Sequence, residues 1–294
     1  MHSYLLHNDD ILEAGSHSLA AGQTGLLTGW GVFSTLRVYE GVLFAWDRHW
    51  RRMQTDAGRM RVPFPSESEW LEERLYRLIE ANRPREATLR VCIVRNRGGL
   101  FEGPGNTRDF DLVAFTGDVR AWGPAAKLGL VPNARFAASE FAGTKYLSWS
   151  ENLTWYERAL AAGLDEALLL NERGEVAECT SANVFAVFGD DVFTPPLSAG
   201  CLPGVTRAVL LEEVRAPGIR VTEKTLLPAE LERADEVFIT STTRELLPVQ
   251  AIEGLNVRRT GTRRAALQPA FSRLVQRYLD THRRLAQSAP PARA

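Results

Sequence analysis

Lysine is almost absent from this chain. Only three of the 294 residues are lysine, namely Lys127, Lys145 and Lys224, so nearly all of the 35 basic side chains are arginine. An ε-amine can lose its proton when it is desolvated and can then attack a carbonyl, whereas a guanidinium effectively cannot. A lysine in a chain that otherwise uses arginine is a candidate for carbonyl chemistry. Codon usage alone would also produce this imbalance between lysine and arginine.

Cysteine, long apolar runs and excess charge are also scarce. The three cysteines form neither a paired framework nor a metal-type spacing, so we expect no disulfide scaffold and no metal site. The first residues lack the basic and apolar regions of a signal peptide, and no apolar run approaches the roughly 18 residues that span a bilayer. A net charge of −1 argues against nucleic-acid and membrane partners. We therefore expect a cytoplasmic protein.

The composition fits a globular chain with a large core, because 45% of the residues are hydrophobic and 24% are charged. The length allows one large domain or two of ordinary size. Residues 117–126 contain two glycines and a proline and look like a linker. We predict domains over residues 1–116 and 127–287, and a disordered, proline-rich and alanine-rich tail over residues 288–294.

Strands and helices alternate in the predicted secondary structure, which indicates an α/β (α+β) fold. The first third contains a predicted hairpin, Gly31–Tyr39 with Val42–Trp46. Two helices follow, one from Asp47 towards Met60 and one over Ser66–Ala81 with Ser66 as its N-cap. The other elements that we predict are strands at Thr88–Arg95, Phe110–Thr116, Glu166–Asn171, Ala182–Phe188 and Glu236–Thr240, and helices at Ser150–Gly163, after Pro203–Arg207, and at Gln268–Leu285.

Two segments of the second predicted domain carry the candidate chemistry. Lys145 lies in Ala-Gly-Thr-Lys-Tyr-Leu, just before a predicted helix, and Glu178 lies in Val-Ala-Glu-Cys-Thr-Ser-Ala-Asn. With five further blocks in the same order, these segments resemble the fold-type IV pyridoxal-phosphate enzymes. That family includes branched-chain and D-amino-acid aminotransferases, R-selective amine transaminases and 4-amino-4-deoxychorismate lyase. The seven blocks are Gly31–Gly41, His49–Met53, Gly143–Leu153, Asp165–Phe185, Thr194–Pro196, Leu202–Arg207 and Ala234–Val249.

The resemblance implies a fold and an activity. It implies a smaller N-terminal α/β domain, a larger C-terminal domain, and pyridoxal 5′-phosphate in the cleft between them. It also implies a homodimer in which a loop of one subunit closes the pocket of the other, and our candidate for this loop is Gly98–Gly105. The expected reaction is amino transfer between an amino acid or amine and a 2-keto acid.

The resemblance also assigns the groups that hold the cofactor. Lys145 would form the Schiff base and then move a proton, and Glu178 would keep the ring nitrogen protonated by charge pairing. Arg52 would bind the phosphate, with Arg51 as the alternative in register. The further cofactor contacts implied are Tyr146 at the phenolic oxygen, Leu202 against the ring, Val205 and Thr206 at a helix N-terminus, and Thr242.

The substrate side departs from the two best-known specificities. The resemblance implies that Phe33, Thr35 and Arg37 face the substrate, and that Thr243 presents a backbone N–H. Arg90 matches the strand arginine of branched-chain enzymes, but the tyrosine two residues before it is absent. The arginine-any-histidine carboxylate trap of D-amino-acid enzymes is also absent between Arg95 and Arg108. Further candidate cations for a carboxylate are Arg95, Arg97 and Arg244.

Two other functions stay open from the sequence. The segments around Phe33, Lys145 and Glu178 are similar to those of 4-amino-4-deoxychorismate lyase, which would release pyruvate and 4-aminobenzoate through the same lysine. A non-catalytic protein that binds the cofactor for structure or regulation is the third possibility. Release of pyruvate without a keto-acid acceptor would favour the lyase, and full activity without Lys145 would favour the non-catalytic protein.

Overall fold

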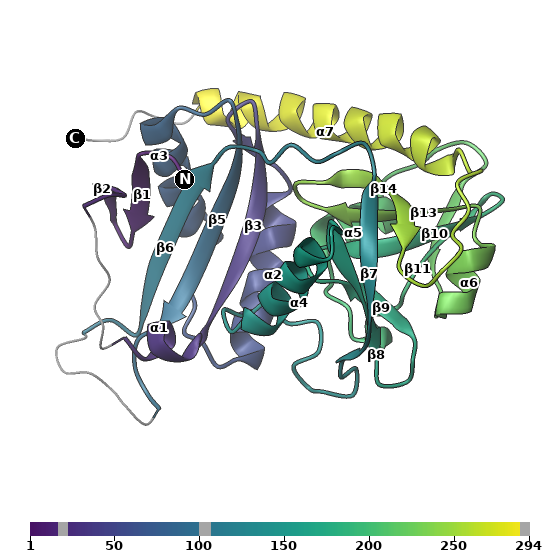
Figure 1. The fold of residues 1–294 in the computed structure, drawn as a ribbon. Helices are drawn as coiled ribbons and strands as arrows, with labels where there is room; N and C mark the ends of the chain where they lie inside the picture. Colours follow the sequence, from purple (N-terminus) through teal and green to yellow (C-terminus); the bar gives the residue numbers. More distant parts are fainter. Residues whose placement is uncertain (17–22, 100–106, 289–294) are drawn as a thin grey trace.

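Two β-sheets organise the chain in the computed structural model (Figure 1). The structure describes residues 1–16, 23–99 and 107–288, and in this part no helix is long and apolar enough to cross a bilayer. The first sheet comes from residues 4–117 and the second from residues 126–252. The two sheets therefore fall on either side of the segment that the sequence predicts as a linker.

The first sheet is antiparallel throughout, with the strand order β2-β1-β6-β5-β3-β4. Two helices, α2 (Trp46–Arg59) and α3 (Ser68–Asn82), cover one of its faces through a shared apolar core. The short α1 (Thr24–Thr28) precedes β3. The strands are β1 (Tyr4–His7), β2 (Asp10–Glu13), β3 (Gly31–Tyr39), β4 (Val42–Leu43), β5 (Glu86–Arg95) and β6 (Phe110–Gly117).

Strand β3, which lies next to the edge strand β4, is buried on both faces, and its side chains alternate between them. Val32, Leu36 and Val38 belong to the core beneath α2 and α3. Phe33 and Thr35 point to the opposite face, where they line a cavity against the second half of the molecule. The alternation therefore makes β3 a wall shared by the core and the cavity.

The second sheet is mixed and has eight strands in the order β12-β11-β10-β13-β14-β7-β8-β9. Three of its neighbouring pairs, β11–β12, β14–β7 and β7–β8, are parallel. Its strands are β7 (Ala126–Arg135), β8 (Glu166–Asn171), β9 (Val176–Cys179), β10 (Asn183–Phe188), β11 (Asp191–Thr194), β12 (Arg220–Glu223), β13 (Glu236–Ser241) and β14 (Glu245–Ile252). The associated helices are α4 (Ser150–Ala161), η1 (Leu197–Ala199), α5 (Val205–Glu212) and α6 (Pro228–Arg233).

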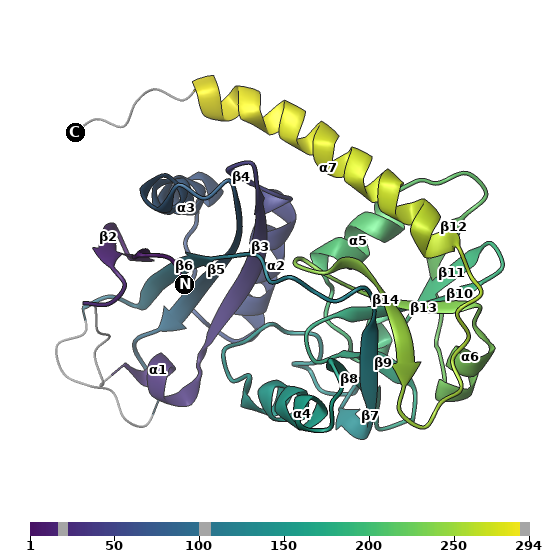
Figure 2. The same ribbon diagram turned by 45° about the horizontal axis from the view of Figure 1, so that its top comes forward.

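The long helix α7 (Arg263–Ser288) extends from the second sheet across to the first half of the molecule (Figure 2). The sequence predicts a shorter helix, Gln268–Leu285, whereas the helix in the structure begins at Arg263 and contains Pro269. The buried Leu267, Ala270 and Phe271 pack in one cluster with Phe44 from the first half. This packing offsets the hydrogen bond that Pro269 cannot donate, so the helix continues through the proline.

Several predicted elements are confirmed, and two of their details are wrong. The hairpin forms, with Val38 opposite Leu43, but its second strand ends at Leu43 and helix α2 begins at Trp46. Ser66 is not the cap of α3, because that helix begins at Ser68 after Glu67. The hydroxyl of Ser68 accepts a hydrogen bond from Nε1 of Trp46 at 2.9 Å, which ties the starts of the two helices together.

Most of the elements that the sequence did not reveal are short, although the ten-residue β7 and the eight-residue β14 were also missed. Strands β1, β2, β9, β11 and β12 have four residues each, too few to establish a period of two. Most of the predicted loop Gly98–Gly105 and the predicted tail after Ser288 lie outside the described residues. Those two predictions therefore stay predictions.

Candidate active site

A cavity of about 550 Å³ lies between the two halves of the molecule. It is lined by β3 and β5 from the first sheet and by β9, β13, α4 and the start of α5 from the second. Twelve of the residues predicted from the sequence line it: Phe33, Thr35, Arg52, Arg90, Lys145, Tyr146, Glu178, Leu202, Val205, Thr206, Thr242 and Thr243. The cavity thus gathers blocks that are more than 200 residues apart in the chain.

Arg37 is the exception, and its placement corrects the prediction. It follows Phe33 and Thr35 on the same side of β3 but lies beyond the cavity. Nη2 of Arg37 is 2.5 Å from Oε2 of Glu86, and the guanidinium lies 4.7 Å from the centre of the Tyr39 ring. Because an acid of the neighbouring strand neutralises it, Arg37 has a structural contact instead of a place at the substrate side.

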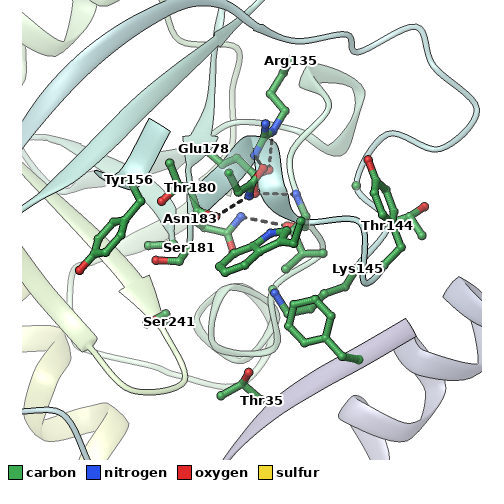
Figure 3. A pocket seen from close by; sticks show the side chains of 18 of the residues that line it. Thr35, Arg135, Thr144, Lys145, Tyr156, Glu178, Thr180, Ser181, Asn183 and Ser241 are labelled. Carbon is green, nitrogen blue, oxygen red and sulfur yellow. Dashed lines mark hydrogen bonds and ion pairs between the residues drawn. The ribbon is translucent and has the colours of Figure 1, made fainter. Parts of the chain in front are cut away.

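Lys145 is held by contacts of its own backbone to the first half of the molecule. Its carbonyl accepts a hydrogen bond from the N–H of Phe33 at 3.1 Å, and its N–H donates to Oδ2 of Asp56 at 3.3 Å. Tyr146 forms a β-bridge with Val32. These contacts fix the backbone on both sides of the lysine, so that its side chain projects into the cavity (Figure 3).

The surroundings of Lys145 favour its neutral form. Nζ lies 4.5 Å from the centre of the Phe33 ring and 5.5 Å from that of Trp149. Burial, together with the positive charges of Arg52 and Arg90, lowers the pKa of Lys145 to about 7. A lysine in this state is partly unprotonated at neutral pH, as a nucleophile for a carbonyl must be.

Glu178 lies at the end of β9 and is held by two donors. Nε of Arg135 is 3.0 Å from Oε1, and the N–H of Leu202 donates to Oε2 at 3.0 Å (Figure 3). Asn152 of α4 in turn accepts from Nη2 of Arg135 at 3.1 Å. The ion pair compensates the charge of a carboxylate that is only 8% exposed. Glu178 therefore presents a fixed negative charge to the cavity.

Arg52, and not its neighbour Arg51, lines the cavity. Its Nη2 donates to Oγ of the buried Ser34 at 2.7 Å, and that hydroxyl is 2.8 Å from Nδ1 of His49. Burial lowers the pKa of Arg52 to about 10, and burial and nearby positive charge hold the pKa of His49 well below its usual range. The neutral His49 adds no competing charge, so Ser34 and His49 orient a cationic guanidinium.

The N-terminus of α5 faces the same cavity through Val205 and Thr206. Its cap is Gly204, and a side chain there would place Cβ 2.0 Å from Oδ1 of Asn183. Asn183 also donates from Nδ2 to the carbonyl of Leu202 at 2.9 Å. The helix therefore begins without a capping side chain, and its first backbone N–H groups and its dipole favour an anion.

These residues fit pyridoxal 5′-phosphate. Nε of Arg52 is buried and has no hydrogen-bond partner among the described residues, as expected of a donor for a phosphate oxygen. Val205, Thr206 and Thr242 supply further groups beside it at the cavity wall. The nucleophilic amine and the carboxylate that the aldehyde and the ring nitrogen require line the same space.

The structure adds functional candidates that sequence reasoning missed. Arg135 and Trp149 touch Glu178 and Lys145, and Trp149 could have been noticed four residues after the lysine. Arg120 and Trp122 come from the predicted linker, and they line the cavity together with Tyr156 of α4. An isolated arginine or aromatic residue in a segment without periodicity forms no sequence pattern that would predict a functional role.

The other arginines that were considered from the sequence are engaged elsewhere. Arg95 donates to the carbonyl of Arg97 at 2.6 Å, lies 4.0 Å from the centre of the Trp30 ring, and does not line the cavity. Arg244 lines the cavity but is buried, with Nη2 2.8 Å from Oε2 of Glu166. Arg97 does not line the cavity, and its Nη1 is 3.7 Å from Oδ1 of Asp109. Arg90 is therefore the predicted cation that remains for a substrate anion.

Comparison with known proteins agrees with this site. Residues 31–252 match the family model of class IV amino-transferases. The chain belongs to the class IV aminotransferases. It is 31% identical to a putative branched-chain-amino-acid aminotransferase of Methanocaldococcus jannaschii over 78% of this chain and 81% of that protein. It is 27% identical to a D-alanine aminotransferase of Bacillus licheniformis over 86% of this chain and 89% of that protein.

A solved structure shows the same fold. A branched-chain amino acid aminotransferase from T.th., in complex with N-(5′-phosphopyridoxyl)-L-glutamate, aligns with a TM-score of 0.84 and 25% identity, over 95% of each chain. The predictions of the fold type, of pyridoxal phosphate as the cofactor and of amino transfer as the reaction are thereby confirmed. This chain is a pyridoxal-phosphate-dependent aminotransferase that transfers an amino group between an amino acid or amine and a 2-keto acid.

Proposed function

We propose that Lys145 binds pyridoxal phosphate as a Schiff base and that this enzyme takes amino acids whose carboxylate binds Arg90. The observation that carries the first part is the position of the half-buried Lys145 beside Phe33 and Trp149, where its pKa is lowered to about 7. The bound cofactor supplies an electron-withdrawing ring that stabilises negative charge at the substrate Cα. Nζ of Lys145, once free, would take the proton from the substrate Cα and deliver it to C4′ of the cofactor.

The remaining cofactor groups orient the ring in this proposal. Arg52 and the N–H groups of Val205 and Thr206 bind the phosphate at one end. Glu178 holds a proton on the ring nitrogen by charge pairing, and Arg135 prevents the carboxylate from turning away. Leu202 packs against one ring face. Tyr146, which lines the cavity, donates to the phenolic oxygen.

Arg90 supports an amino acid over a simple amine as the substrate. It lies opposite Thr35 in the register of β3 and β5, with its guanidinium 4.1 Å from the centre of the Phe33 ring. Burial lowers the pKa of Arg90, and its Nε has no hydrogen-bond partner among the described residues. A substrate carboxylate would compensate this buried charge and complete its hydrogen bonds. Thr243, also at the cavity wall, would add a backbone N–H.

We propose a homodimer as the working unit. Phe136, Phe141 and Leu153 line the mouth of the cavity, with 64%, 41% and 47% of their surfaces exposed. Exposed apolar side chains grouped in this way mark surfaces that bind another chain. Sedimentation should give twice the mass of the 32.7 kDa chain, and Phe136→Asp should shift it towards the monomer. A wild-type monomer at assay concentrations would refute the dimer.

We also propose domain boundaries and a location. Domains over residues 1–116 and 127–287 are supported by the two sheets, which these ranges separate. Residues 117–126 then have a second role beyond linking, because Arg120 and Trp122 line the cavity. The cytoplasm is supported by the three cysteines, each of them unpaired and buried.

The test is a visible spectrum of the purified enzyme with single amino donors and no acceptor. The panel is L-leucine, L-glutamate, D-alanine, R-1-phenylethylamine and aminodeoxychorismate. We expect an amino acid to bleach the band of the protein-bound cofactor and a 2-keto acid to restore it. Bleaching by phenylethylamine alone would refute the carboxylate contact. Release of pyruvate from aminodeoxychorismate, with the band restored unaided, would instead establish the lyase.

A further inference from the structure

A buried ion pair lies at the cavity, between Glu166 of β8 and Arg244. Nη2 of Arg244 is 2.8 Å from Oε2 of Glu166, and the two residues are 8% and 0% exposed. Removing two charges from water offsets much of the attraction between them, so a buried pair is weak evidence for stability. The contacts of this pair indicate what else it does.

Both oxygens of Glu166 hold the connection between β9 and β10 (loop 180–182). Oε1 accepts a hydrogen bond from Oγ1 of Thr180, and Oε2 accepts one from Oγ of Ser181 at 2.6 Å. The N–H of Ala167 also donates to Oε1, at 3.0 Å, and the guanidinium of the ion pair donates to Oε2. Each oxygen thus accepts two hydrogen bonds, and a buried network whose members are satisfied in this way is rigid.

The guanidinium of Arg244 joins this loop to the connection between β13 and β14 (loop 242–244). Its Nη1 donates to the carbonyl of Ser181 at 3.2 Å and to the hydroxyl of the same residue at 3.0 Å. The backbone N–H of Arg244 donates to Oγ of Ser241 at 3.2 Å. One side chain therefore connects two loops that belong to different strand pairs.

Trp122 adds a second contact to loop 242–244. The centre of its ring lies 3.8 Å from Cζ of Arg244, and its Nε1 donates to the carbonyl of Thr243 at 3.1 Å. The guanidinium thus uses its flat face for the indole and its N–H groups for Glu166 and Ser181. A lysine could form the ion pair but not this whole set of contacts, because an ammonium is neither flat nor forked.

Loop 180–182 is also bonded to the residue that is proposed to hold the cofactor ring. The carbonyl of Thr180 accepts from Nδ2 of Asn152 at 2.7 Å, and Oδ1 of Asn152 accepts from Nη2 of Arg135 at 3.1 Å. Arg135 in turn pairs with Glu178. Thr180 and Glu178 both line the cavity (Figure 3). The buried ion pair therefore connects the other loop to a frame that includes Glu178.

We propose that Arg244, anchored by Glu166, is a positioning residue that holds loop 242–244 in place relative to the cofactor ring. The proposal rests on the proposed function, in which Thr243 presents its N–H to the substrate carboxylate and Glu178 holds the ring. The charge of Arg244 is compensated by Glu166, so Arg244 acts through the loop and does not bind the substrate itself. Loss of the pair should therefore raise KM for amino acids and change kcat little.

The test compares Arg244→Met with the double variant Arg244→Met/Glu166→Gln. The single variant leaves a buried carboxylate without its partner and should lower Tm, whereas the double variant removes both charges and should return Tm to within about 3 °C of the wild type. The substrate is the amino acid of the donor panel that bleaches the cofactor band. Its KM should rise about tenfold in the double variant, because a hydrogen bond to a charged group is misplaced, with kcat within about threefold. Recovery of KM together with Tm would show a purely stabilising pair and overturn the proposal.

Hydrogen–deuterium exchange of the cofactor-loaded enzyme gives a readout without a substrate. Peptides that cover loop 242–244 should exchange about tenfold faster in the double variant. Arg244→Lys keeps the charge and should recover Tm but only part of KM. Arg74→Met is the matched control, because Arg74 also pairs with an acid, Asp9, and lies 3.9 Å from the centre of the Trp70 ring, but does not line the cavity. It should leave KM and the exchange of the loop unchanged.

Two further results would overturn the positioning role. One is unchanged exchange of loop 242–244 in the double variant. The other is faster exchange of the loop with an unchanged KM. If no amino acid of the panel is a donor, the proposed function fails, and the exchange measurement still decides whether Arg244 holds the loop.

Discussion

The two walls of the cavity differ in how their charges are compensated. At the wall of the second sheet, Glu178 pairs with Arg135, and Arg244 pairs with Glu166. At the wall of the first sheet Arg90 has no carboxylate partner among the described residues, although it is largely buried. Arg120, at the outer end of the cavity, also lacks one within the described chain.

The difference separates charges that hold the protein structure from charges that are available to a ligand. A buried ion pair fixes the position of both partners but leaves little charge for a ligand. An arginine without an acid keeps its full charge for an incoming carboxylate. In the proposed function the paired Glu178 holds the cofactor ring, whereas Arg52, which has no ion pair among the described residues, binds its phosphate and Arg90 binds the substrate carboxylate.

The largest effect is expected at Lys145. Lys145→Ala should lower kcat for every substrate by about a thousandfold or more, because it removes both the nucleophile and the proton carrier. Lys145→Arg should be equally inactive, since a guanidinium keeps its proton at neutral pH. Lys224→Ala is the control and should retain activity. Turnover of any substrate at more than a tenth of the wild-type rate in Lys145→Ala would contradict the assignment.

Glu178→Gln removes the acid from the ion pair between Glu178 and Arg135. The variant should lose about a hundredfold in kcat, because a neutral amide no longer holds a proton on the ring nitrogen. Steady-state kinetics at saturating cofactor measures this loss. Glu151→Gln removes a different, exposed acid of the same cavity and should stay within about threefold. Comparable losses in both variants would show that the effect is general electrostatics and not the contact of Glu178.

Ser34→Ala tests the hydroxyl that orients Arg52. Loss of a hydrogen bond to a charged group should weaken the binding of pyridoxal phosphate about tenfold. The affinity for pyridoxal, which lacks the phosphate, should not change. Equilibrium titration of the cofactor-free enzyme with both compounds measures the difference. Ser148→Ala, at the same cavity but bonded to Thr28, is the control, and equal weakening for both compounds would exclude a phosphate-specific role.

The smallest effect concerns the charge of Arg90. Only the unprotonated amine captures the cofactor, so the capture rate of the wild type should rise with pH through about 7 and then level off. The charge of Arg90 lowers the pKa of Lys145, so Arg90→Met should raise the midpoint of this profile. Arg90→Lys retains a positive charge and should move the midpoint less. A midpoint that falls in Arg90→Met would contradict the sign.

The sequence predicted the cofactor side of the cavity better than the substrate side. Lys145, Glu178 and Thr206 lie in local motifs whose chemistry can be recognised within a few residues, and all three line the cavity. Arg37 shares the strand pattern of Phe33 and Thr35, but a partner on another strand, Glu86, decides its role. Such pairing depends on the register between two strands, which cannot be read from the sequence of one strand alone.

The prediction of the fold has the same limit, because distant contacts decide some of its elements. Long elements with buried periodic faces, such as β3 and α2, were predicted almost to their ends. Helix α7 was predicted too short, and residues near its start pack against Phe44, which lies far away in the chain. Arg120 and Trp122 were assigned to a linker, since only tertiary structure brings them to the cavity.

The most direct test of the account is to locate the lysine that carries the cofactor. Borohydride reduction of the loaded enzyme makes that linkage permanent, and peptide mass spectrometry then identifies the modified residue. We predict a pyridoxyl group on Lys145, which is half-buried, and none on the exposed Lys127 or Lys224. Modification of Lys127 or Lys224 with Lys145 unmodified would contradict the central claim.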